Sequence, residues 1–150
     1  MKFAHLIKLS VFSHGYENSE AIKNALVKLI PFILSENRIL IKISGAEGLN
    51  GNKIQIFEVV LSKASLIKKF LDSLIGRLDK GQKKLIIAQA ESRLDSNFDF
   101  FLRFDKDALI KSNELELTDS GKCFHIKIGI AAFPKKRGVA LNIARELFSK

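Results

Sequence analysis

Cationic side chains alternate with apolar ones along several stretches that have the pattern of half-buried strands. The cations at the polar positions are Lys8, Lys42, Arg103 and Lys127, and the large apolar residues among them are Phe12, Leu40 and Phe101. Ammonium and guanidinium groups neutralise phosphates, and an exposed phenyl ring offers a stacking surface to an unpaired base. The pattern predicts a sheet face that binds RNA. The alternative is a solvated face whose rings pack in a dimer or under a loop.

A second group of cations follows Pro134. Lys135, Lys136 and Arg137 lie near the start of the last predicted helix, where the helix dipole disfavours positive charge by about 0.3–1 kcal/mol per residue. Local stability therefore does not favour cations at these positions. Gly138 lets a ligand approach the free backbone N–H groups, so the segment predicts a phosphate-binding site. A flexible basic turn is the alternative.

Four aspartates bracket one of the predicted strands: Asp95, Asp99, Asp105 and Asp107. Carboxylates gathered around Mg²⁺ can support phosphodiester cleavage, so a magnesium-dependent nuclease is one hypothesis. The run from Asp105 to Asp107 is more typical of a helix start, where acidic residues are favourable. The three histidines and the single cysteine, Cys123, do not have zinc-site spacing. We therefore predict a protein with no catalytic residues, no metal site and no cofactor.

Length and composition restrict the class of protein further. The 150 residues are 47% hydrophobic with two prolines, which predicts a single globular domain over residues 1–150. The 25 lysines and arginines against 16 acidic residues give a formal net charge of +9, which attracts polyanions. The sequence contains no convincing signal peptide, no cysteine pair and no apolar run of about 18 residues. We expect a soluble cytoplasmic protein with no membrane partner.

Apolar periodicity and turn residues predict the secondary structure. Strands are predicted at residues 3–11, 38–44, 54–61, 98–104 and 123–130, with a short strand as one interpretation of 114–117. Helices are predicted from an Asn18 or Ser19 cap to Pro31, from a Ser62 cap to a break at Gly81, and at residues 82–93, 105–112 and 139–148. Segments 38–44 and 54–61 are expected to form an antiparallel hairpin with a long loop. This order predicts an α+β fold in which helices cover one face of an antiparallel sheet.

Several spaced motifs together resemble a known family. They are His14-Gly15-Tyr16-Glu17, the loop from Glu47 to Asn52, Arg93-Leu94-Asp95, the strand end from Leu102 to Lys106, and Ala131 to Lys135. In that order they resemble an archaeal family of predicted RNA-binding proteins or exosome-associated subunits, over nearly the whole chain. The resemblance implies a fold similar to the fifth large-subunit ribosomal protein. It also implies that Arg93, Arg103, Asp105 and Lys106 belong to the family's common core.

The loop departs from the family pattern. The family often has His-Tyr where this chain has Leu49-Asn50, and an acidic residue where Asn18 follows Glu17. An RNA contact made by loop aromatics in relatives is therefore in doubt here.

The leading hypothesis is a non-enzymatic RNA-binding module with low sequence specificity, accessory to RNA processing and associated with the exosome. Its predicted RNA-binding residues are Lys8, Lys42, Arg93, Arg103, Lys106, Lys127, Lys135, Lys136 and Arg137. An interaction subunit that docks an acidic protein partner is the first alternative, and the magnesium-dependent nuclease is the second. The hypothesis requires that the excess cations gather on one surface rather than stand singly beside carboxylates.

Overall fold

The computed structural model describes residues 2–48 and 51–150. The chain divides into two compact units. Unit 1 consists of Met1–Ile7, Leu61–Leu102 and Lys127–Lys150, and unit 2 consists of Lys8–Val60 and Arg103–Ile126. None of the helices within the described ranges is long and apolar enough to cross a bilayer.

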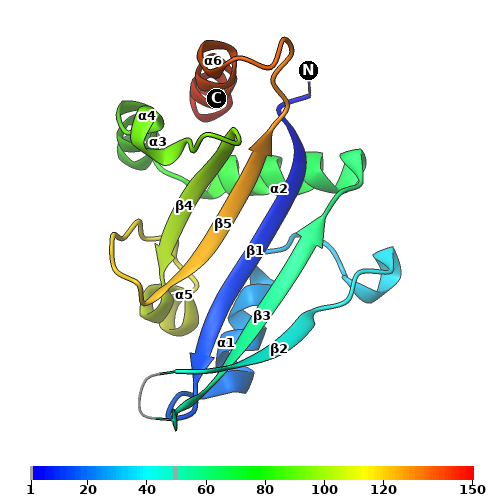
Figure 1. Ribbon diagram of the computed structural model, residues 1–150, viewed down its shortest axis with the longest axis vertical. Helices are drawn as coiled ribbons and strands as arrows, with labels where there is room; N and C mark the ends of the chain where they lie inside the picture. The colour runs from blue at the N-terminus through cyan, green and yellow to red at the C-terminus, as the bar shows by residue number, and fades with distance from the viewer. Residues whose placement is uncertain (1, 49–50) are drawn as a thin grey trace. The chain divides into compact units, whose positions relative to one another are not determined.

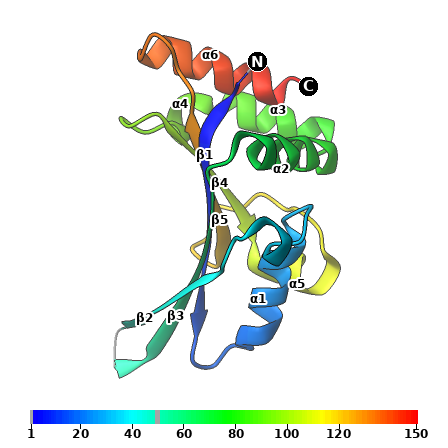
Figure 2. The same ribbon diagram turned by 90° about the vertical axis from the view of Figure 1, so that its right-hand side faces the viewer.

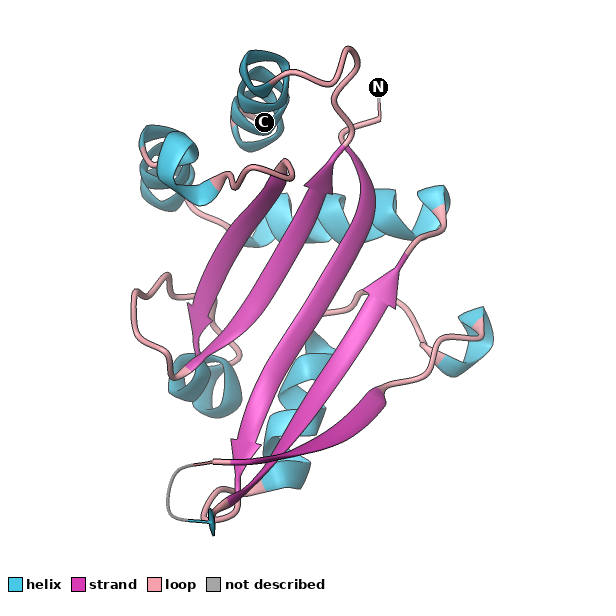
Figure 3. Cartoon of the chain, viewed as in Figure 1, coloured by secondary structure: helices cyan, strands magenta, loops and turns pink. Residues whose placement is uncertain are grey.

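The strands form one five-stranded sheet (Figures 1 and 3). They are β1 (Ala4–His14), β2 (Lys42–Glu47), β3 (Lys53–Leu61), β4 (Asp99–Asp105) and β5 (Cys123–Ile130). Their order is β2-β3-β1-β5-β4, and neighbouring arrows run in opposite directions (Figure 1). The predicted α+β fold with an antiparallel sheet is confirmed.

Unit 2 holds two helices on one side of its strands, α1 (Ser19–Lys28) and α5 (Lys106–Ser112) (Figure 2). The side chains of Leu9 and Val11 are fully buried, whereas Phe12 is 42% exposed, which is the alternation that a strand with one covered face requires. Asn18 caps α1 as predicted, since its Oδ1 accepts a hydrogen bond from the Ala21 N–H at 3.1 Å.

The prediction of a strand at 38–44 was wrong in its first half. A short 3₁₀ helix, η1 (Ser35–Asn37), ends at Arg38, which has a φ of 58°, and the Ile39 N–H donates to the Leu34 carbonyl. Arg38 is therefore outside the β region of backbone conformation, and β2 begins four residues later at Lys42. The predicted hairpin is confirmed, with β2 and β3 antiparallel and Lys42 opposite Glu58.

Unit 1 contains α2 (Ala64–Arg77), α3 (Lys80–Ala88), α4 (Ala90–Arg93) and α6 (Arg137–Phe148). Helix α3 packs against α4 and α6, and α4 also packs against α6. Phe70 lies on the buried face of α2. The rings of Phe100 and Phe148 stack with their centroids 5.6 Å apart, which joins β4 to α6 within the apolar core of this unit.

Three local predictions need correction. The N-cap of α2 is Lys63, without a side-chain cap bond, and not Ser62. Gly81 does not break a helix but lies inside α3, because Asp79 and Gln82 form a capping box that starts a new helix there. Residues 114–117 form no strand of their own, and Leu117 makes an isolated bridge to Phe104.

Candidate nucleic-acid interface

The side of the unit 2 strands opposite α1 and α5 presents cationic and aromatic side chains. We call Lys8 and Phe12 of β1, Arg103 of β4 and His125 of β5 the strand face. Lys8 and Phe12 are four residues apart in one strand and so point to the same side. The Phe12 ring meets the His125 ring edge to face, with centroids 6.1 Å apart. A partly exposed ring and two cations thus share one surface.

Only part of the positive charge on this side is balanced by carboxylates. The Lys8 Nζ lies 3.6 Å from Glu58 Oε1, and Lys42 faces the same glutamate across the β2–β3 pair. Glu58 thus pairs with Lys8, and the register places Lys42 opposite the same residue. The Arg103 guanidinium is exposed and makes a long, 3.5 Å contact to the Asp119 carbonyl, which leaves donors for a phosphate. Some of the cations on this side therefore have a carboxylate partner, and others keep an unbalanced positive charge.

Histidine contributes no charge to the strand face at neutral pH. Burial lowers the pKa of His125, and the positive charge of Arg103 lowers it further. Burial also disfavours the charged form of the neighbouring Cys123, and for a thiol this raises the pKa. The Cys123 Sγ lies 3.5 Å from His125 Nε2. The thiol stays protonated, so this pair does not form a reactive thiolate.

In unit 1, two of the predicted RNA-binding residues make contacts within the fold. The Lys127 Nζ lies 3.6 Å from Asp99 Oδ2. The Arg93 guanidinium donates to the Gln89 side chain at 2.6 Å and to the Phe101 carbonyl at 3.1 Å, which ties α4 to the β4 strand. The structure therefore gives Arg93 a positioning role.

The basic segment after Pro134 splits into two kinds of residue. Arg137 donates to the carbonyls of Glu91, Leu94 and Asp95 at 2.8–3.4 Å. These carbonyls lie at the C-terminal end of α4, where a cation satisfies unpaired acceptors and complements the helix dipole. Lys135 and Lys136 are exposed, and neither has an ion pair within the described part of the chain.

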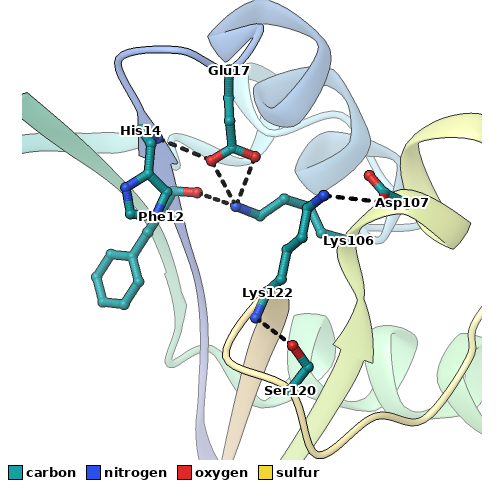
Figure 4. A network of polar contacts seen from close by, with 7 residues as sticks. All are labelled: Phe12, His14, Glu17, Lys106, Asp107, Ser120 and Lys122. Carbon is teal, nitrogen blue, oxygen red and sulfur yellow. Dashed lines mark hydrogen bonds and ion pairs between the residues drawn. The ribbon is translucent and has the colours of Figure 1, made fainter.

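Lys106 is buried rather than presented to solvent. Its side chain is 3% exposed, and its Nζ donates to the Phe12 carbonyl at 2.8 Å and to both Glu17 oxygens at 3.1 and 3.2 Å (Figure 4). A phosphate cannot reach an ammonium held in this way. Sequence reasoning missed this pair, although Lys106 starts α5, where the dipole disfavours a cation unless an acid compensates it.

Glu17 makes the stability of this network depend on pH. Burial would raise its pKa, but hydrogen bonds from the His14 N–H and from Lys106 outweigh burial and hold the pKa below its usual value of 4.5. The stabilisation is therefore complete above the unfolded-state pKa and is lost as pH falls through the lower folded-state pKa. We expect the free energy of unfolding to decline more steeply in acid for the wild type than for Glu17→Gln. Urea denaturation from neutral pH downward measures both, and identical slopes would contradict the expectation.

The four aspartates do not assemble a metal site. Asp95 accepts the N–H groups of Asn97 and Asp99, Asp105 caps α5 through the Ala108 N–H, and Asp107 pairs with Lys122 at 3.1 Å. Over residues 2–48 and 51–150, no three His, Cys, Asp or Glu side chains converge as metal ligands would. The carboxylates thus serve turns, a cap and ion pairs.

The glycine-containing hairpin loop is described only at its ends. The Gly48 N–H donates to the Asn52 carbonyl at 2.7 Å, and Gly51 has a φ of 74°. The loop positions where the family pattern differs, Leu49 and Asn50, lie outside the described residues.

Comparison with known proteins identifies a family and relatives of this chain. The model of a family described as "RNA binding" matches residues 6–130. A curated protein from Pyrococcus abyssi named as an RNA-binding protein is 30% identical over 143 residues, which cover 95% of this chain and 92% of the relative.

Solved structures show the same fold over nearly the full length. A protein from Archaeoglobus fulgidus superposes with a TM-score of 0.86 at 31% identity, covering 96% of this chain and 99% of its own. A protein from Methanothermobacter thermautotrophicus superposes with a TM-score of 0.78 at 27% identity, covering 97% of this chain and 98% of its own.

Proposed function

This chain belongs to the archaeal RNA-binding family whose model it matches, and from that membership we propose that it binds RNA itself, without catalysis and with low sequence specificity. The observation that carries the proposal is the match to a relative named as an RNA-binding protein, at 30% identity over 95% of the chain. The net charge of +9 supports it, because a cationic surplus attracts polyphosphates before specific contacts form.

The strand face is the surface that we propose for the phosphates. Arg103 has an exposed guanidinium with donors to spare, and Lys42 lies opposite Glu58, the partner of Lys8, in the β2–β3 pair. Phe12 adds a 42% exposed ring beside these cations, which suits a flexible single strand. Lys135 and Lys136 are a second set of available cations, in unit 1. Lys106 is excluded from the proposed contacts because it is buried against Glu17, and Arg137 because both of its terminal nitrogens donate to backbone carbonyls.

Salt dependence tests the proposal directly. Each phosphate neutralised on a single strand contributes about −0.7 to the slope of log affinity against log salt concentration. We expect binding of mixed-sequence single-stranded RNA to have a slope of about −2 to −3, as three or four phosphate contacts would give. Fluorescence anisotropy over a salt series measures the slope. A flat plot, or no binding at low salt, would contradict the proposal.

We also propose, from the family resemblance alone, that the bound RNA belongs to an RNA-processing system such as the exosome. The same cations could instead dock an acidic protein. Copurification of processing factors that RNase treatment abolishes would support the RNA-linked role, whereas an acidic protein that remains bound after RNase would support the alternative.

A further inference from the structure

A small polar hollow lies in unit 2 beside the turn between β1 and α1. Its volume is about 200 Å³, and it is lined by Phe12, His14, Tyr16, Glu17, Lys106, Gly121 and Lys122. Sites for drug-sized ligands are larger, about 300–1,000 Å³. The hollow therefore suits a flat group the size of one heterocycle, and its walls combine rings with a carboxylate and an ammonium.

Tyr16 supplies a ring face at this hollow. Its side chain is 81% exposed, and its ring stacks on His14 with centroids 5.3 Å apart and planes 9° from parallel. The His14 ring lies parallel to the phenol and offset from it, and most of the tyrosine surface is exposed. An aromatic face that is both exposed and held in position is a stacking platform for an unpaired base.

The buried ion pair holds this platform in place. The Glu17 N–H donates to the His14 carbonyl at 2.9 Å, the His14 N–H donates back to Glu17 Oε1 at 3.1 Å, and Lys106 binds the same carboxylate from below (Figure 4). Buried ion pairs add little net stability over well-packed apolar residues. The two hydrogen bonds between His14 and Glu17 close a turn, and Gly15 and Tyr16 are the two residues inside that turn. A preorganised ring loses less entropy when it binds.

Polar groups at the hollow suit the edge of a base better than a phosphate. Glu17 Oε2 accepts one hydrogen bond, from Lys106 at 3.2 Å, and a carboxylate oxygen has capacity for a second. Lys122 adds an exposed ammonium, which pairs with Asp107. The Glu17 carboxylate would repel the anionic phosphodiester, whereas it can accept a hydrogen bond from the amino or imino N–H of a base.

We propose that this hollow binds one unpaired nucleobase of a single-stranded RNA, stacked on the exposed ring of Tyr16 with its polar edge toward Glu17 and Lys122. The inference rests on the proposed RNA binding and extends it, because the strand face contacts phosphates whereas this hollow contacts a base. It also adds a rigid aromatic contact that the charge pattern of the sequence did not reveal.

An abasic RNA separates the base contact from the phosphate contacts. We expect Tyr16→Ala to weaken binding of a mixed-sequence ribo-octanucleotide by about 5- to 150-fold, the contribution of one stacked base. Affinity for the abasic octanucleotide of the same length should not change, and Tyr16→Phe, which keeps the ring, should bind both RNAs like the wild type. Fluorescence anisotropy at one fixed salt concentration measures all of these affinities.

A blocking variant and a spectroscopic probe test the same site independently. A Cβ at Gly121 would meet no atom within 4 Å, so Gly121→Leu should fold normally, fill the hollow and weaken base-bearing RNA selectively. Tyr16 is the chain's one tyrosine, so its ring signals in an NMR spectrum are unambiguous and should move upfield with the base-bearing octanucleotide only.

Three results would overturn the inference, and they differ in what they imply for the proposed function. Normal salt-dependent RNA binding with unmoved Tyr16 signals, or equal losses for base-bearing and abasic RNA, would reject the hollow and leave the proposed function intact. Failure of the wild type to bind either RNA at low salt would reject both.

Discussion

Glu17→Ala is expected to lower the free energy of unfolding by about 3–5 kcal/mol, a large part of the stability of a domain this size. The reason is the burial of Lys106, whose ammonium would keep a single acceptor, the Phe12 carbonyl at 2.8 Å, once the carboxylate is gone. Chemical denaturation followed by circular dichroism measures the change.

Lys106→Met is the matched control for that experiment. It removes the buried charge and keeps an unbranched side chain of similar length, while Glu17 retains its bond from the His14 N–H and 13% exposure of its side chain. We therefore expect Lys106→Met to lower the free energy of unfolding by less than Glu17→Ala does. The double variant should be more stable than Glu17→Ala alone. If the free energy of unfolding of Glu17→Ala lies within about 1 kcal/mol of the wild-type value, the prediction is contradicted, because the Lys106 ammonium must then reach water.

Replacing Lys8 and Arg103 together by alanine is expected to weaken RNA binding by about 25-fold at 0.1 M salt. The figure follows from losing two single-strand phosphate contacts at a slope of about 0.7 each. The slope of log affinity against log salt should become shallower by about 1.4. Anisotropy titrations over a salt series measure both quantities, and the melting temperature reports whether loss of the Lys8–Glu58 contact affects the fold.

Lys69→Ala with Lys84→Ala provides a control of identical charge change. Both lysines are exposed and lie on helices of unit 1, α2 and α3. Because they lie outside the strand face, we expect less than a threefold loss of affinity, about the size of a general change in net charge. Equal losses for the two double variants would indicate diffuse attraction and argue against the strand face as the RNA-binding site.

The period-2 patterns predicted most strands closely because each has one covered face. The segment 123–130 was predicted with the bounds that β5 has, and 54–61 differs from β3 by one residue. The pattern failed at 38–44, where Ile39 and Ile41 alternate like a strand but precede it. The backbone of Arg38 is left-handed there, a conformation that non-glycine residues adopt only where surrounding structure imposes it.

Charge alone did not distinguish cations that bind a partner from cations that support the fold. Lys106 and Arg103 lie three residues apart, yet Lys106 is buried against Glu17, 89 positions earlier, and Arg103 is exposed. Arg137 looked like part of a phosphate site with Lys135 and Lys136, but it binds carbonyls more than forty positions away. Such long-range partners are invisible to local patterns. The likeness to the fifth large-subunit ribosomal protein stays a prediction.

The position of β1 in the sheet determines how the chain must be assembled. The strand order places β1 between β3 and β5, so β1 pairs on one side with a strand that begins more than one hundred residues further along the chain. Pairings of such high contact order close slowly, because loop entropy is lost before contacts form. The chain through β5 must therefore leave the ribosome before β1 gains its second neighbour. Until then the face of β1 that carries Ile7, Leu9 and Val11 is exposed, and it can aggregate or bind chaperones.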